Sequence, residues 1–151
     1  MKLSTIVLAL AVSLLAISGP AMAADPPSHI MTWGSQGHST GSFNIPRAAA
    51  VDASGNVYVA DRYNNRIQKF SNSGSFITSW NNLNNPRGVC VDGNYVYVSD
   101  TSNNRIVKYT TSGSLVTSWG SYGTGASQLN LPMGLEVYNG VVYVTDSSNH
   151  R

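Results

Sequence analysis

Short apolar runs separated by small polar residues are the dominant pattern of this chain after residue 24. The runs are rich in Val and Tyr, and the motif VYV occurs at 57–59, 96–98 and 142–144. No long stretch places apolar residues at positions i, i+3, i+4 and i+7, as an amphipathic helix requires. Gly, Asn and Ser, which fill the intervals, favour turns over helix interiors. The pattern therefore predicts an all-β protein built from short strands.

Three sequence markers recur in a fixed order along the chain. A proline opens one apolar run, an aspartate closes a second, and a tryptophan closes a third. The prolines are Pro46, Pro86 and Pro132, the aspartates are Asp61, Asp100 and Asp146, and the tryptophans are Trp33, Trp80 and Trp119. Successive prolines or aspartates lie 39 to 46 residues apart. This period is typical of a four-stranded β-propeller blade.

One repeat unit divides into four strands joined by short turns. In the first unit we expect strands a to d at about 48–52, 57–61, 66–71 and 76–80, with Asn-Gly and Ser-Gly pairs in the hairpin turns. The three units cover about 46–85, 86–131 and 132–151, and the last one is incomplete. Residues 29–33 are expected to be the outer strand of a preceding blade. Strands without polar alternation are buried on both faces, which favours stacked blades over a sandwich.

The recurring units resemble NHL repeats, which form β-propellers, commonly of about six blades. The resemblance rests on Pro46-Arg47-Ala48 and Pro86-Arg87-Gly88, on the VYVxD strand, and on the D-x-x-N-N-R-I-x-K-aromatic passage at 61–70 and 100–109. The third copy departs from this pattern at Met133, Tyr138 and His150. About two and a half blades are present, which predicts the N-terminal part of a longer chain. Assembly from several short chains is the other explanation.

The first 23 residues have the features of a secretory signal peptide. Lys2 precedes a twelve-residue apolar run at 6–17, and Ala21-Met22-Ala23 offers a cleavage site. The run is too short to span a membrane, so we expect no transmembrane segment after cleavage and an extracytoplasmic mature chain at 24–151. Removing Lys2 leaves eight basic and seven acidic residues. This near-balance gives no reason to expect a nucleic-acid partner.

In every copy the aspartate that closes strand b is followed five positions later by an arginine. The pairs are Asp61 with Arg66, Asp100 with Arg105, and Asp146 with Arg151. A guanidinium can hold a carboxylate and nearby loop carbonyls together, and the intervening Asn residues tolerate left-handed backbone. Because the motif occurs once per unit and arginine cannot act as a base near neutral pH, we interpret it as a structural loop clamp.

The remaining candidates for chemistry have simpler interpretations. The three tryptophans are expected to pack between blades, and Cys90 in GVCVD is expected to be a buried, unreactive thiol. Asp52 and Asp92 lie in ordinary Gly-containing turns, and the histidines show no zinc-ligand spacing. The sequence therefore predicts no catalytic residue, no metal site and no cofactor.

The loops between strands d and a, and between b and c, emerge on one face of a propeller. They vary in length here, whereas the turns on the opposite face are short. Variable loops on a rigid scaffold commonly carry function. We therefore expect any binding site on this loop face, at Arg47, Arg62, Arg87, Tyr63 and Tyr122. Simple solvation of these side chains is the alternative.

Two functional classes remain open on the sequence. The first is an exported, non-catalytic scaffold that binds a protein, a small molecule or a glycan. The second is implied by resemblance alone: some similar propellers are lyases or lactone hydrolases that hold a metal in the central channel. Such ligands would lie in blades outside this sequence, and metal analysis of a full-length protein would separate the two classes.

Overall fold

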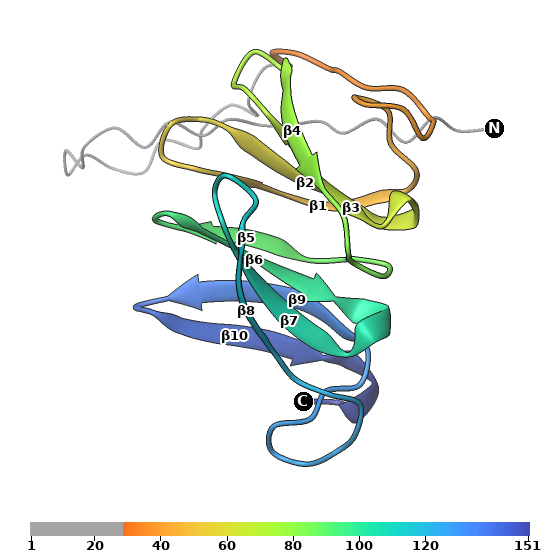
Figure 1. Ribbon diagram of the computed structural model, residues 1–151, viewed down its shortest axis with the longest axis vertical. Coiled ribbons are helices and arrows are strands. Elements are labelled where there is room, and N and C mark those ends of the chain that lie inside the picture. The colour runs from red at the N-terminus through yellow and green to blue at the C-terminus, as the bar shows by residue number, and fades with distance from the viewer. Residues whose placement is uncertain (1–28) are drawn as a thin grey trace, which may run out of the picture.

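The computed structural model describes residues 29–151 as three antiparallel sheets stacked one on another (Figure 1). The first contains β1 (Pro46–Val51), β2 (Val57–Asp61), β3 (Arg66–Phe70) and β4 (Phe76–Trp80). The second contains β5 (Val89–Asp92), β6 (Tyr95–Asp100), β7 (Arg105–Thr110) and β8 (Leu115–Trp119). The third pairs β9 (Pro132–Tyr138) with β10 (Val141–Asp146). The all-β, four-stranded blade architecture is confirmed.

The order of strands in each sheet follows the order of the chain. The sheets run β1-β2-β3-β4 and β5-β6-β7-β8, and each b-to-c loop forms one short 3-10 turn. These turns are η1 (Arg62–Asn64), η2 (Thr101–Asn103) and η3 (Ser147–Asn149). The inner strand β5 lies between the inner strands β1 and β9 of the neighbouring sheets. In the first blade, strand a begins at Pro46 and not at about residue 48 as predicted, because Pro46 pairs with Asp61 across a β-bulge.

The expectation of an outer strand at 29–33 is wrong, because the structure assigns no strand to these residues. Within the described part of the chain, this segment has no inner strand beside it with which to form a ladder. Trp33 nevertheless packs on the first blade as Trp80 packs on the second. Its ring lies 6.0 Å from that of Phe70 and borders Gly74, as Trp80 lies 5.7 Å from Tyr109 and borders Gly113. The predicted signal peptide at 1–23 lies outside the described residues.

The largest apolar core lies between the first two blades. Tyr58, Ala60 and Ile67 of the first blade pack with Val89, Val96, Val98, Val107 and Tyr109 of the second. Trp80 bridges them, because its ring also lies 6.1 Å from that of Tyr58. The predicted role of the tryptophans in blade packing is therefore confirmed for Trp80. Trp119 contacts Tyr97 of its own blade and is 40% exposed.

The second and third sheets are joined by hydrogen bonds from side-chain hydroxyls to backbone carbonyls and by a close approach of their backbones. Ser99 Oγ donates to the carbonyl of Met133 at 2.6 Å, and Thr101 Oγ1 donates to the carbonyl of Pro132 at 2.7 Å. A Cβ atom at Gly88 would lie 2.3 Å from the Met133 oxygen. Only glycine at position 88 therefore permits this approach. No helix within 29–151 is long and apolar enough to cross a membrane.

Candidate functional site

The Asp–Arg motif forms an ion pair in all three units. Each arginine Nε donates to the aspartate Oδ2 across the turn between strands b and c. The bonds join Arg66 to Asp61 at 2.8 Å, Arg105 to Asp100 at 2.7 Å, and Arg151 to Asp146 at 2.9 Å. Buried carboxylates are stable as anions only when paired and hydrogen-bonded. The geometry fits the predicted clamp, which links the two strands that each turn joins.

The clamp also reaches a second loop, which the sequence did not indicate. The other carboxylate oxygen, Oδ1, accepts a backbone N–H from the loop that precedes strand a. The donors are Asn44 at 2.7 Å, Asn84 at 2.6 Å and Asn130 at 2.7 Å. Backbone N–H groups of the b-to-c turn return bonds to the same asparagines' carbonyls, from Tyr63, Ser102 and Ser148. Each aspartate therefore fixes both loops of its unit at the loop face.

The residues between aspartate and arginine have two distinct roles. The first asparagine donates its side-chain amide to the aspartate Oδ2, as Asn64 does at 2.8 Å and Asn103 at 2.9 Å. The next residue adopts left-handed backbone, with φ of 55° at Asn65, 53° at Asn104 and 56° at His150. Asn is among the non-glycine residues that adopt this conformation most readily. The left-handed backbone that the sequence predicts for Asn is present at Asn65 and Asn104, and His150 adopts the same conformation in the third copy.

Hydrogen bonding determines the ionisation of the third clamp. Burial by itself raises the pKa of Asp146, but donation from Asn130 N–H, Asn149 and Arg151 outweighs it. The pKa of Asp146 therefore lies below its ordinary value of 3.8. The carboxylate is ionised at neutral pH, which is the state in which it accepts all three bonds.

Four of the five residues expected on the loop face lie close together. Arg87 precedes β5, Arg47 lies in β1, and Arg62 and Tyr63 lie in η1. The Arg62 guanidinium carbon lies 4.4 Å from the centre of the Tyr63 ring, and Arg62 Nε donates to Asn85 Oδ1. Burial lowers the pKa of Arg87, as do the neighbouring charges of Arg62 and Arg47. The cluster therefore brings three guanidinium groups within electrostatic reach of one another.

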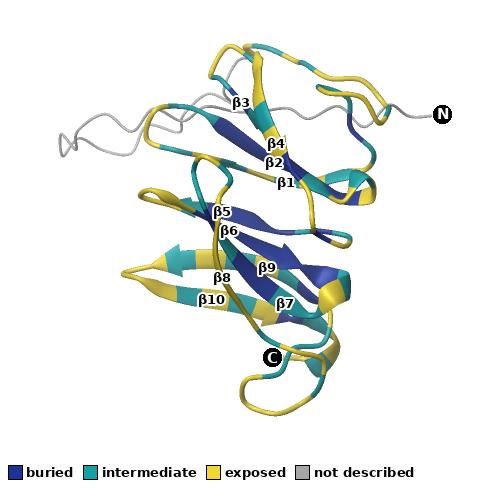
Figure 2. Cartoon of the chain, in the orientation of Figure 1, coloured by how far each residue is buried: buried dark blue, intermediate teal, exposed yellow. Residues whose placement is uncertain are grey.

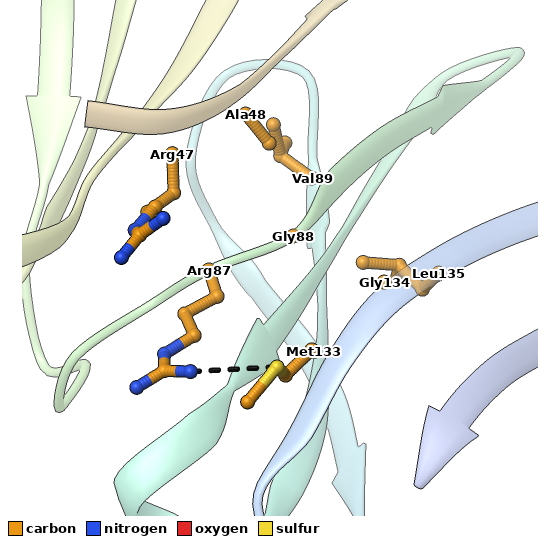
Figure 3. Close-up of a pocket in the computed structure, with 8 residues that line it drawn as sticks. All are labelled: Arg47, Ala48, Arg87, Gly88, Val89, Met133, Gly134 and Leu135. Carbon is orange, nitrogen blue, oxygen red and sulfur yellow. Dashed lines mark hydrogen bonds between the residues drawn. The ribbon is translucent and has the colours of Figure 1, made fainter. Parts of the chain in front are cut away.

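A hollow of about 330 Å³ opens beside this cluster, between the first residues of the three inner strands. Arg47, Arg87 and Met133 occupy equivalent positions after the three recurrent prolines. Arg87 and Met133 lie side by side, since Arg87 Nη1 lies 3.4 Å from the Met133 sulfur (Figure 3). On the sequence alone, Met133 is only a departure from the repeat. Its position directly after Pro132 was the signal that could have placed it here.

Tyr122 lies on the same face but in a different loop, between β8 and β9. It is 71% exposed, and its backbone bridges to Leu129. The loop is tied to η3, because Asn149 Nδ2 donates to the Gly123 carbonyl at 2.9 Å. Tyr122 therefore belongs to the clamped loop face without belonging to the arginine cluster.

The other candidates for chemistry occupy structural positions. Burial and the nearby carboxylates of Glu136 and Asp92 raise the pKa of the Cys90 thiol to about 12, so it is protonated at neutral pH. Asp52 accepts bonds from Ser54 N–H, Asn56 N–H and the Tyr58 hydroxyl, as a turn residue does. Within residues 29–151, no three His, Cys, Asp or Glu residues are grouped as metal ligands would be.

Comparison with known proteins identifies the repeats. The NHL repeat family matches at residues 43–70 and 83–109. The chain is 38% identical to NHL repeat-containing protein 3 of Homo sapiens over 42% of its length and 20% of that protein. It is 45% identical to protein lin-41 of Caenorhabditis elegans over 32% of its length and 4% of that protein. The matched regions thus span a small part of these relatives.

Solved structures support the fold. A streptogramin B lyase structure superposes with a TM-score of 0.56 at 20% identity, over 71% of this chain and 34% of that one. The virginiamycin B lyase from Staphylococcus aureus gives 0.55 at 18% identity, over 67% and 34%. At such identities the likeness concerns the fold alone. Together with the repeat matches and the blade geometry, it shows that this chain carries NHL repeats folded as β-propeller blades.

Proposed function

We propose that this protein is an exported, non-catalytic scaffold that binds a protein, small-molecule or glycan ligand through its loop face. The observation that carries the proposal is the clamp. In all three units a buried aspartate fixes the loop before strand a to the turn after strand b. Loops held in one conformation lose little entropy on binding, so they form a prepared surface.

The exposed residues on this face suit recognition. Tyr63 is 48% exposed and Tyr122 is 71% exposed, and aromatic side chains are enriched where proteins contact partners. The near-balance of charge in the mature chain favours such a ligand over nucleic acid. The apolar run at 6–17 and the small residues at 21–23 support export. Expression of the whole sequence should release a chain into the extracytoplasmic fraction whose first residue, by mass spectrometry, is Ala24. A chain found only in the cytoplasm would contradict export, and retention of residues 1–23 would contradict signal-peptide cleavage.

Three exposed tyrosines, two on the loop face and one on the opposite face, give the test of the binding face. The full chain would be applied to printed arrays of glycans and of peptides. Tyr122→Ser and Tyr63→Ser should weaken the strongest signals at least about tenfold, the effect of losing a well-packed aromatic contact.

The matched control is Tyr138→Ser. Tyr138 is 67% exposed, like Tyr122, but it ends β9 beside the turn to β10, on the face opposite the clamps. This variant should bind as the parent chain does. An equal loss of array signal in Tyr138→Ser and Tyr122→Ser, or unchanged signals in all the variants, would contradict a binding site on the loop face.

A further inference from the structure

We propose that the hollow between the inner strands is a binding site for an organic carboxylate that carries an apolar group, with Arg47 and Arg87 contacting the carboxylate. This inference deepens the proposed function, since it rests on the loop face being the binding face and names the chemistry of its ligand. The supporting observations are the unpaired charges of the cluster, the environment of Arg87, and the apolar side of the hollow.

Among residues 29–151, no carboxylate forms an ion pair with the arginines of this cluster. The ion pairs among residues 29–151 are the three clamps, and their carboxylates are taken up by Arg66, Arg105 and Arg151. Arg47, Arg62 and Arg87 are in none of them. Three guanidinium groups without a carboxylate create a local positive potential, which attracts anions most strongly where the surface is concave.

Arg87 is the least satisfied of the three. Its Nε is buried without a hydrogen-bond partner, and the acceptor of its Nη1 is the thioether sulfur of Met133. Sulfur is a weak acceptor, and a buried donor on a charged group is costly to leave unpaired. A carboxylate at this position would replace the thioether with an acceptor that matches the planar guanidinium fork.

The rest of the hollow is apolar and rigid. Figure 3 shows the guanidinium groups of Arg47 and Arg87 on one side and Ala48, Val89 and Leu135 on the other. Arg47 and the three apolar residues belong to β1, β5 and β9, whereas Arg87 lies two residues before β5, so most of the wall is formed by strands. A volume of about 330 Å³ is at the lower end of the range for small-molecule sites. A small acid with an aliphatic group fits this division better than a polyanion does.

The test uses N-acetyl-leucine, with N-acetyl-leucinamide as the neutral analogue, added to the full chain labelled with 15N. Titration should shift the Arg87 Nε–H and Gly88 amide signals, with a dissociation constant on the order of a millimolar for a ligand of this size. The amide should bind at least about tenfold more weakly, because it cannot form charge-assisted bonds. Raising the salt concentration should weaken the binding of N-acetyl-leucine but not that of the neutral amide.

The variants separate this site from a general effect of charge. Arg87→Gln and Arg47→Gln should each weaken binding of the acid about tenfold; Arg47 is exposed, so its replacement does not threaten folding. Lys108→Gln removes the same charge from β7, where Lys108 Nζ lies 3.7 Å from the Tyr95 ring centre, and should have no effect.

Three results would overturn the inference. The first is equal affinity for the acid and the amide. The second is an equal loss of acid binding in Lys108→Gln and Arg47→Gln. The third is the absence of chemical-shift changes at Arg87 and Gly88 during the titration. Inorganic sulfate that binds as tightly as N-acetyl-leucine would contradict the role of the apolar side. Peptides that end in Leu with a free or an amidated C-terminus would distinguish a protein terminus from a free acid as the source of the carboxylate. Failure here would leave the tyrosine test of the loop face intact.

Discussion

The same three letters, VYV, have different environments in the complete blades and in the third sheet. In β2, Val57, Tyr58 and Val59 are at most 1% exposed, whereas Tyr143 in the middle of the β10 motif is 56% exposed (Figure 2). The strands have the same composition and pair with the same type of strand a. The difference arises because β2 lies between β1 and β3, with a second blade against one face, whereas β10 pairs with β9 alone. The apolar composition of a strand therefore shows that it can be buried on both faces. Its actual burial depends on the strands and blades that lie beside it.

The exposure of the clamp arginines also increases from the first blade to the third unit. The Arg66 side chain is 12% exposed in the first blade, against 45% for Arg151 in the third unit. The bond lengths are nearly equal, so geometry alone does not distinguish them. The contribution of an ion pair depends strongly on its burial, and this gives a series of matched variants in one protein.

The largest expected effect is loss of the first clamp. Asp61→Asn removes the charge that accepts from Arg66, Asn64 and Gln68, and leaves the guanidinium partly buried without a carboxylate. We expect a loss of about 3 kcal/mol in unfolding free energy, measured by urea denaturation. Asp146→Asn should cost about 1 kcal/mol, because Arg151 can be solvated. Equal costs would contradict a role for burial.

The second effect concerns the valines that follow the tyrosine of the motif. Val59→Ala should destabilise by about 2 kcal/mol, because Val59 is fully buried and its removal leaves a cavity. Val144→Ala, at the equivalent and half-buried position, should cost less than about 1 kcal/mol on the same grounds. Denaturation of the two variants under identical conditions checks this. A reversed order would mean that β10 is buried in solution.

A smaller effect is expected from Arg105→Lys in the second blade. Arg105 donates to Asp100 through Nε and to the Asn82 carbonyl through Nη2. Lysine keeps the charge but cannot reproduce the planar fork, so we expect about 1 kcal/mol of destabilisation and a melting temperature lower by a few degrees. Lys108→Arg makes the reverse exchange outside the clamp and should leave the melting temperature unchanged. An unchanged melting temperature in Arg105→Lys would count against the clamp.

The smallest effect is the pH dependence of the third clamp. The pKa of Asp146 is below 3.8 in the folded chain, so its contribution is present above the ordinary pKa and is lost as pH falls through the folded value. Unfolding free energies measured between pH 7 and pH 3 should therefore decline more steeply for the parent chain than for Asp146→Asn. Parallel profiles would show that Asp146 has an ordinary pKa.

The strands and the Asp–Arg pairs could be predicted from the sequence because both are local. The sequence predicts strand b at 57–61, and the structure has it at Val57–Asp61, since turn residues and apolar runs delimit it. The meeting of Arg47, Arg62 and Arg87 depends on how blades stack, which no local pattern contains. The sequence predicts Arg62 as a binding residue of the loop face, with simple solvation as the alternative, yet Arg62 is only 8% exposed, because it stacks on Tyr63 and donates to Asn85. The strand expected at 29–33 failed for the same reason: strand formation there depends on a neighbour.

The central claim is that each buried aspartate holds two loops in a fixed arrangement and so prepares the loop face. Amide hydrogen exchange tests it most directly. The Asn44 and Asn84 amides lie outside the named strands and donate to Asp61 and Asp100. They should exchange as slowly as amides within β2 and β6, with Asn130 faster because its unit is more exposed. Exchange of Asn44 and Asn84 at the rate of the open turn at Gly93 would contradict the claim.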